Sequence, residues 1–202
     1  MPCPRLAPPI IGLVMMLAAP ALAQAPPSPQ AEPTSPPVAG PAVPSLLQPG
    51  DAFGEEVTLP ARTVVYVTGH SAWDSAFDTL AAAYKSLTQS LDKQGIKPSG
   101  PPMTIYTDTD DTGFGFQAAL PVAEAPKALP GDLKVGQAPS GKALKFVHRG
   151  SYDAMDSTYE AITNYLDEKQ MEAKDQFIEE YVTDILKTSP DHLVVNIYVP
   201  VK

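Results

Sequence analysis

The order of strand-like and helix-like segments occurs twice along this sequence, and this repetition constrains the fold more than any other feature. In the first copy, a strand, an amphipathic helix and two further strands are predicted at residues 63–68, 73–91, 103–107 and 114–120. In the second copy, the same elements are predicted at residues 143–148, 151–166, 177–183 and 193–199. The copies keep a nearly constant spacing, because Val67 and Val147 are 80 positions apart and Pro121 and Pro200 are 79 apart. We therefore predict a duplicated strand-helix-strand-strand unit, with halves at about 57–122 and 141–202.

Neither predicted unit has enough elements to bury its own core. Apolar residues recur at three- and four-residue steps along both helices, at Leu80, Tyr84, Leu87 and Leu91 and at Met155, Tyr159, Ile162 and Leu166. We expect an α+β fold in which the two units join side by side into one antiparallel sheet with two packed helices. The seam between the units forms a central groove, where a small molecule would bind. The Pro-, Ala- and Gly-rich segment 123–140 is predicted to be a crossover linker.

The beginning of the chain has the pattern of a secretory signal peptide. Arg5 precedes an apolar run at residues 10–22, and small residues surround Ala23. This run is shorter than the roughly 20 apolar residues that a membrane-spanning helix needs. We predict a signal peptide at 1–23, a Pro- and Ala-rich disordered linker at 24–52 and one folded domain at 53–202. A periplasmic or secreted protein with no stable membrane insertion after cleavage follows from this.

Charge and cysteine content limit the partners of the protein. The formal net charge is −9, which disfavours binding to the phosphates of a nucleic acid, so we expect no nucleic-acid partner. The single cysteine, Cys3, lies before the apolar run and would be removed with the signal peptide. The folded domain is therefore expected to contain neither a disulfide nor a reactive thiol.

Two adjacent acids in an apolar segment are the candidate binding groups. Glu179 and Glu180 lie within the predicted strand 177–183, among apolar and aromatic residues. A buried carboxylate is costly unless something compensates its charge, and a cationic ligand would do so. Because successive side chains of a strand face opposite ways, one of these glutamates points inward and the other outward. The residue pattern alone does not decide which.

Turn residues between the predicted elements have structural interpretations. Ser71 and Ser151 are each placed to cap a following helix. The acidic segment Asp108–Gly113 lacks the downstream Glu of an EF-hand loop, so a hairpin turn is favoured over a calcium site. His70 and His148 follow the two first strands without further ligands at metal-binding spacing, so we predict no metal, haem or other cofactor.

The sequence resembles the GyrI-like, or bacterial effector-binding (SOUL-like), domain family, which also forms the ligand-sensing part of AraC-type and MerR-type multidrug regulators. The second half carries this resemblance at His148–Tyr152, Tyr159, Glu180–Tyr181, Asp184 and Ile197–Val201. The first half carries it at Gly100–Pro102 and Ile105–Asp108. The sequence departs from the family pattern at Ser151, where a proline often follows the turn glycine, and after Asp184.

The resemblance implies a pocket for amphipathic, often cationic, organic molecules with an acid at its base. By motif position that acid is Glu180, and Tyr152 is the matching aromatic wall. Trp73 corresponds to Tyr152 in the first copy, although a tryptophan on a helix face also suits a core position. Tyr106 and Tyr181 are equivalent by the repeat and complete the predicted set of ligand-binding residues.

These features together predict an exported protein that binds a small amphipathic, cationic molecule. Two alternatives remain open at this point. One is a hydrolase of small reactive electrophiles that uses the same glutamate, and the sequence offers no nucleophile-base pair for it. The other is a protein-protein interaction module. The sequence favours binding over catalysis and leaves the identity of the ligand and the oligomeric state open.

Overall fold

The computed structural model describes residues 48–174 and 176–202. Within these ranges the strands are β1 (Phe53–Leu59), β2 (Thr63–Ala72), β3 (Met103–Thr109), β4 (Gly113–Pro121), β5 (Lys134–Gln137), β6 (Gly141–Gly150), β7 (Ile178–Tyr181) and β8 (Leu193–Pro200). The helices are α1 (Ala76–Lys93) and α2 (Met155–Lys169), with short 3-10 helices η1 (Trp73–Ser75), η2 (Tyr152–Ala154) and η3 (Pro190–His192). The predicted signal peptide and residues 24–47 of the predicted linker lie outside the described residues.

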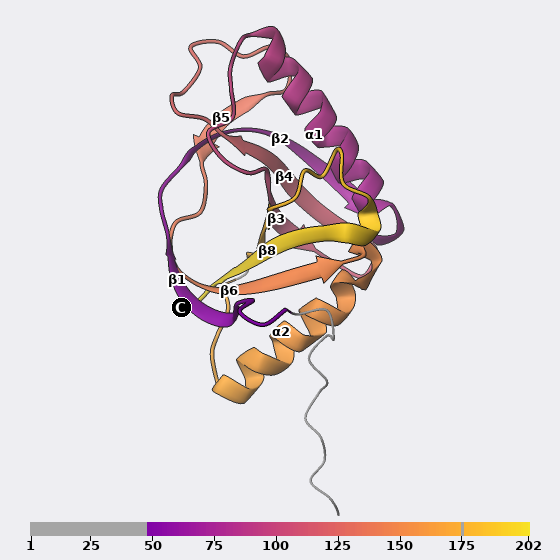
Figure 1. Cartoon of the computed structure of the whole chain (residues 1–202). Coiled ribbons are helices and arrows are strands. Elements are labelled where there is room, and N and C mark those ends of the chain that lie inside the picture. The colour runs from indigo at the N-terminus through magenta and orange to yellow at the C-terminus, as the bar shows by residue number, and fades with distance from the viewer. Residues whose placement is uncertain (1–47, 175) are drawn as a thin grey trace, which may run out of the picture. The chain divides into compact units, whose positions relative to one another are not determined.

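All the described strands form one antiparallel sheet in the order β1-β6-β8-β7-β3-β4-β2-β5. The pair β3 and β7 joins the two halves, with β4 and β2 on one side and β8 and β6 on the other. The predicted α+β fold of two strand-helix-strand-strand units that share one antiparallel sheet is therefore confirmed. Figure 1 shows α1 lying along β2 and β4, and α2 lying beside β6.

The two outer strands, β1 and β5, were not predicted. β1 pairs with β6 of the other half, and β5 pairs with β2. Segment 123–140 is thus not a plain crossover linker, because it contains β5. The β1–β6 and β2–β5 pairings share one register, since Leu59 pairs with Gly141 and Thr63 with Gln137. Between the two pairings, the Ala138 amide donates to the Arg62 carbonyl at 2.9 Å. β1 with β2, and β5 with β6, therefore act as two long bent strands.

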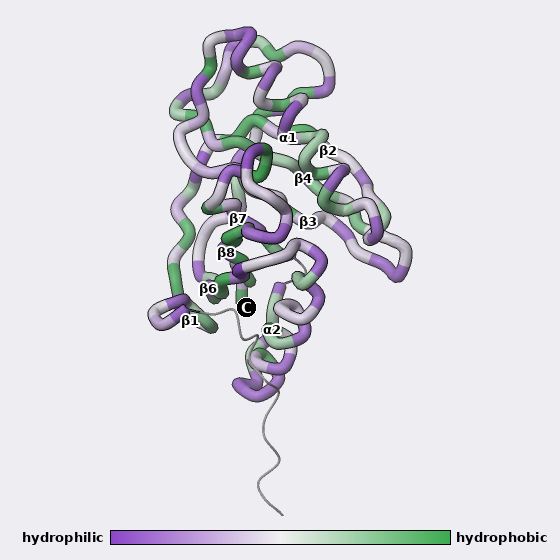
Figure 2. The backbone as a smooth tube through the Cα atoms, turned by 45° about the vertical axis from the view of Figure 1, so that its right-hand side comes forward, coloured by the Kyte–Doolittle hydropathy of each residue, from purple (hydrophilic) through white to green (hydrophobic). Residues whose placement is uncertain are grey.

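The helices bury the faces that their sequence spacing predicts. In α1 the buried residues are Ala76, Leu80, Tyr84, Leu87 and Leu91, and in α2 they are Met155, Thr158, Ile162 and Leu166. Figure 2 shows hydrophilic and hydrophobic residues alternating along α2, as expected of a helix with one buried face. None of the described helices is long and apolar enough to cross a lipid bilayer.

The two predicted serine caps have different outcomes. The Ser151 hydroxyl accepts a hydrogen bond from the Asp153 amide at 3.3 Å, which confirms its cap on η2. Ser71 instead lies inside β2, where it pairs with Phe114, so the predicted cap is wrong. The difference arises because β2 runs past Ser71 to Ala72, whereas β6 ends at Gly150, just before Ser151.

Strand β7 is buried on both of its faces. On the helix side, Glu179 and Tyr181 point into the core formed with α1 and α2. On the other side, Ile178 packs in a second apolar cluster with Met103 and Ile105 of β3. Each of the two adjacent glutamates therefore lies in a buried environment of its own, which a strand with one solvated face would not provide.

Candidate functional site

The carboxylate of Glu179 lies at the centre of the helix-side core, with a relative exposure of 0%. Its Oε1 accepts hydrogen bonds from the hydroxyls of Tyr106 and Tyr159, both at 2.8 Å. Its Oε2 accepts one from the Tyr181 hydroxyl, also at 2.8 Å. Three phenol hydroxyls thus satisfy the hydrogen-bonding capacity of the carboxylate without neutralising its charge, and no cationic side chain contacts it among the described residues.

The fold explains how these side chains come together. Antiparallel pairing of β3 with β7 sets Thr104 opposite Glu179, and alternation turns Tyr106 and Tyr181 toward the same face. Helix α2 packs over that face and supplies Tyr159. The site therefore takes one strand from each half and the helix of the second half.

Burial governs the electrostatics of this group. Burial raises the pKa of Glu179 above its ordinary 4.5, and the three tyrosine hydrogen bonds oppose that rise. Burial, followed by the nearby charge of Glu179, also raises the pKa values of Tyr106, Tyr159 and Tyr181 well above 10.0. The phenols therefore stay protonated and remain hydrogen-bond donors.

A cavity of about 170 Å³ opens beside Glu179. Its walls include Trp73, Tyr106, Tyr152 and Tyr159. It adjoins an outer cavity of about 450 Å³, which shares Trp73, Tyr106, Asp156 and Tyr159 with it and extends to Thr109, Asp110, Asp111, Thr163 and Phe177. The lining of both cavities contains acids and aromatics, and none of the described lining residues is Lys, Arg or His. Their combined space suits a small organic molecule.

Trp73 and Tyr152, two of the predicted aromatic walls, both line the cavity beside Glu179. The Tyr152 hydroxyl lies 3.4 Å from that of Tyr106, and the ring of Tyr152 packs on Phe77 with centroids 5.5 Å apart. Trp73 is 46% exposed, so it is not a core residue. Its indole Nε1 donates to the Asp110 carbonyl at 2.8 Å, and its ring packs against Phe114.

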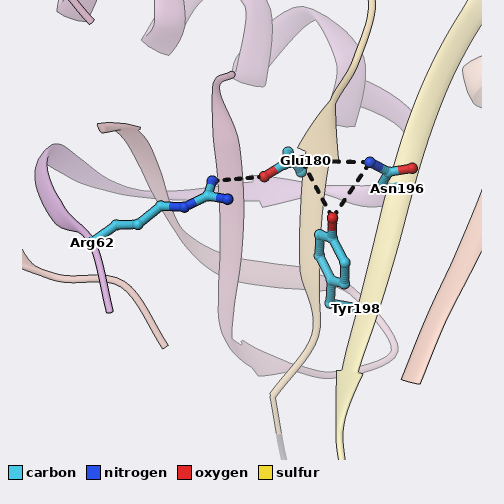
Figure 3. Close-up of polar contacts among 4 residues, drawn as sticks. All are labelled: Arg62, Glu180, Asn196 and Tyr198. Atoms are coloured by element: carbon cyan, nitrogen blue, oxygen red, sulfur yellow. Dashed lines mark hydrogen bonds and ion pairs between the residues drawn. The ribbon is translucent and has the colours of Figure 1, made fainter. Parts of the chain in front are cut away.

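The prediction that Glu180 is the acid among these aromatic side chains is wrong. Glu180 lies on the opposite face of β7, where its Oε2 accepts from Arg62 at 2.9 Å (Figure 3). Its Oε1 accepts from Asn196 at 3.4 Å and from the Tyr198 hydroxyl at 3.3 Å. The cavity beside this pair measures about 20 Å³, which holds about one water molecule and no organic ligand.

Glu179 occupies the place that the family motif assigned to Glu180. Strand alternation already set Glu179 on the face of Tyr181, but it did not show which face of the strand would border a cavity. Tyr159 and Asp156 were not predicted as site residues, although both line the cavity. Tyr159 was assigned to the packing face of a helix and to the family resemblance, without a role in the site.

The other polar groups singled out in the sequence have structural roles. Asp110 Oδ1 accepts from the Thr112 amide and hydroxyl and from the Gly113 amide, which fixes the β3–β4 turn and lowers the pKa of Asp110. His148 is buried, with its Nδ1 2.8 Å from the Thr158 hydroxyl and its Nε2 3.0 Å from the Ser151 carbonyl. No group of three or more potential metal ligands occurs within the described part of the chain.

Solved structures of several other proteins share this fold. The C-terminal domain of EcmrR is 16% identical, with a TM-score of 0.64, and the match covers 75% of this chain and 98% of that domain. In the EcmrR–DNA complex the same region covers only 57% of the EcmrR chain. SAV2435, solved bound to tetraphenylphosphonium, is 18% identical, with a TM-score of 0.52 and coverage of 74% and 94%.

A third related structure is a hydrolase from Listeria innocua, 13% identical with a TM-score of 0.50, covering 75% of this chain and 93% of that one. No protein with a curated description matches this sequence significantly. The sequence profile described as "GyrI-like small molecule binding domain" matches residues 55–202, which includes every residue of the site. The chain therefore belongs to the GyrI-like small molecule binding domain family.

Proposed function

We propose that this protein captures an amphipathic organic cation in the cavity beside Glu179. One observation carries the proposal: among the described residues, a fully buried carboxylate has only phenol hydroxyls as partners, and it lies at the base of a cavity lined by aromatic residues. A cation that enters this cavity meets an uncompensated negative charge away from bulk water. Aromatic contacts add roughly 0.5 to 2 kcal/mol each, depending on how far the cation is desolvated.

The charge around the entrance favours the same class of ligand. Asp156 lines both the inner and the outer cavity, and Asp110 and Asp111 line the outer one. A cation is attracted toward this mouth, whereas an organic anion is repelled. The exposed indole of Trp73 offers a flat apolar surface at the same entrance. An aromatic or aliphatic body with one positive centre fits these surroundings.

The comparisons support a small-molecule role. The family profile is described as binding small molecules, and SAV2435 was solved with the lipophilic cation tetraphenylphosphonium. We extend that cationic class to this chain on the strength of Glu179 and its aromatic surroundings.

We further propose that the protein is exported and held on a Pro-rich tether in the periplasm or outside the cell. The proposal depends on the signal-peptide pattern around Arg5 and Ala23 and on the composition of residues 24–47. Expression of the full chain in a Gram-negative host, followed by fractionation and mass spectrometry of the N-terminus, tests it. A mature N-terminus near Ala23 or Ala25 supports export, and intact Met1 in the cytoplasm contradicts it.

Titration calorimetry with methyltriphenylphosphonium tests the binding function. The natural protein is compared with Glu179→Gln and with Glu180→Gln as a matched control, because the two acids are neighbours on opposite faces of one strand. We expect Glu179→Gln to weaken binding at least tenfold and Glu180→Gln to leave it unchanged. Equal affinity in the natural protein and Glu179→Gln would show that the buried charge does not attract the ligand.

A second candidate function is hydrolysis of small reactive electrophiles in the same cavity. Burial raises the pKa of Glu179 above its ordinary 4.5, and a raised pKa favours a carboxyl group that accepts and returns a proton. Product analysis with a panel of epoxides and activated esters separates this function from binding. Turnover that disappears in Glu179→Gln and persists in Tyr159→Phe supports it, and the absence of turnover in the natural protein excludes it for that panel.

A further inference from the structure

A second, larger cavity of about 540 Å³ lies on the α1 side of the β3–β7 seam. Its walls come from α1, from the Pro-rich segment before β3 and from the loop after β7. Tyr84 and Tyr181 line it, and both are almost fully buried. This volume lies within the range of small-molecule sites, roughly 300 to 1,000 Å³.

The polar groups that lie beneath the two cavities occupy equivalent positions in the two halves. Thr104 pairs directly with Glu179 across the β3–β7 ladder, and the two residues are 75 positions apart (179 minus 104). The same spacing relates Tyr84 to Tyr159 and Tyr106 to Tyr181. The hydrogen bonds match as well, because the Thr104 hydroxyl contacts the hydroxyls of Tyr84 at 2.8 Å and Tyr181 at 3.2 Å. Each centre is thus held by the helix tyrosine of its own half and a strand tyrosine of the other.

The walls of the second cavity follow the same correspondence. Of the nine residues that line the outer cavity at Glu179, seven have a counterpart 75 positions away in the lining of the second cavity. Among them are Thr163 with Thr88, Phe177 with Pro102, and Asp110 and Asp111 with Ile185 and Leu186. Seven matches at one spacing indicate that the second cavity is the structural counterpart of the first. We call it the α1 cavity.

The α1 cavity differs from its counterpart in charge. Thr104 stands where the other half has Glu179, and Ile185 and Leu186 stand where it has Asp110 and Asp111. Asp184 is paired with Lys187 at 2.7 Å, and Asp92 lies exposed in the last turn of α1. Neither of the tyrosines at the base of this cavity is charged, so a charged ligand would lose its hydration there without a direct ionic partner.

Exposed apolar side chains also gather at the α1 cavity. Val182 is 54% exposed and Leu186 is 41% exposed, and both line it. Trp73, another exposed large hydrophobic residue, lines the cavity at Glu179. Clustering of such residues at the two matching cavities marks surfaces that gain from being covered by an apolar molecule.

We propose that the α1 cavity is a second small-molecule site, which takes an uncharged amphipathic molecule with an apolar body and one polar group. The body packs on Leu186, Val182 and the prolines, and the polar group lies toward Tyr84 and Tyr181 at the base. The two halves of the fold thus offer structurally equivalent sites for different ligands, one for a cation and one for a neutral molecule. This inference does not depend on the cation proposal.

Two probes of nearly equal shape test the α1 cavity. Triphenylphosphine oxide and methyltriphenylphosphonium carry the same three phenyl rings, and only the second is charged. Thr88→Trp fills the α1 cavity from a half-buried position on α1, and Thr163→Trp fills the counterpart from α2. By calorimetry, we expect Thr88→Trp to weaken the oxide at least tenfold and Thr163→Trp to leave it unchanged. No saturable oxide binding, or loss in Thr163→Trp alone, overturns the proposal.

A surface variant keeps the test valid if Thr88→Trp does not fold. Leu186→Lys adds a charge at an exposed position in the wall of the α1 cavity, and Val135→Lys adds one at a similarly exposed position on β5 outside both cavities. Oxide binding should weaken at least fivefold in Leu186→Lys and stay unchanged in Val135→Lys. Equal oxide affinity in these two variants contradicts the proposal.

Discussion

Glu179 and Glu180 are neighbours in β7, yet their carboxylates lie on opposite faces of the sheet and have different partners. Glu179 is held by three tyrosine hydroxyls beside a cavity, and Glu180 is paired with Arg62. A carboxylate paired with arginine has its charge compensated within the protein, whereas one that accepts only from phenols keeps a net negative charge for a ligand.

The affinity of the natural protein for methyltriphenylphosphonium should increase as the pH rises above 4.5. Burial raises the pKa of Glu179, so at low pH this group is neutral and does not attract a cation. Affinity should level off once the pH exceeds the pKa of Glu179 in the folded protein. Calorimetry at several pH values measures this, and Glu179→Gln should show no such rise. A parallel rise in both proteins would assign the effect to other groups.

The stability of Glu179→Gln relative to the natural protein should also depend on pH. Because folding raises the pKa of Glu179, its protonated form favours the folded state, and that contribution is fully present below about 4.5. The contribution is lost as the pH rises through the folded pKa. Urea unfolding should therefore show the variant gaining stability over the natural protein between pH 4.5 and pH 8. A constant difference across this range would contradict the raised pKa.

Tyr159→Phe should weaken cation binding at neutral pH by roughly tenfold, which corresponds to about 1.4 kcal/mol. The change removes one of the two donors to Oε1 of Glu179, so it raises the pKa of that carboxyl further and lowers the fraction that is charged. Tyr84→Phe is the matched control, because Tyr84 occupies the equivalent helix position and bonds to Thr104 instead. Calorimetry with both variants at pH 7 checks this, and equal losses would point to general loosening of the core.

Arg62→Met should lower the free energy of unfolding by about 1–3 kcal/mol and leave cation binding unchanged. The variant leaves the Glu180 carboxylate, 8% exposed as a residue, without its cationic partner. The partial exposure of Arg62, 35% for its side chain, keeps the loss below that of a fully buried pair. Urea unfolding measures it, and the double variant Arg62→Met with Glu180→Gln should recover part of the loss. No recovery would mean that Arg62 stabilises the fold mainly by packing.

Local pattern predicted the elements and the α+β arrangement, because the spacing of residues such as Leu80, Leu87 and Ile162 already defines buried helix faces. It did not predict β1 and β5, because the short exposed segment Lys134–Gln137 becomes a strand only through pairing with β2. Such long-range pairing leaves little local signal.

Only part of the candidate site was predicted, again because long-range packing leaves little signal in the local sequence. Alternation placed Glu179 and Tyr181 on one face, but which face of β7 carries a cavity depends on the position of α2, which sequence spacing does not give. Both faces of β7 proved to be buried, so burial alone could not distinguish the two acids. The aromatic walls Trp73, Tyr106 and Tyr152 were predicted, and the structure brings all three to one cavity.

β1 comes first among the described strands but pairs with β6 of the second half, and this pairing affects the order of folding during biosynthesis. Ribosomes make Phe53–Leu59 well before Gly141–Gly150, so β1 leaves the exit tunnel with its backbone amides and carbonyls still without a partner. The first half, even when fully translated, waits for β5 to cover β2. Folding is thus completed late, because β6 and β7 both pair with β8, the last of the described strands to be made.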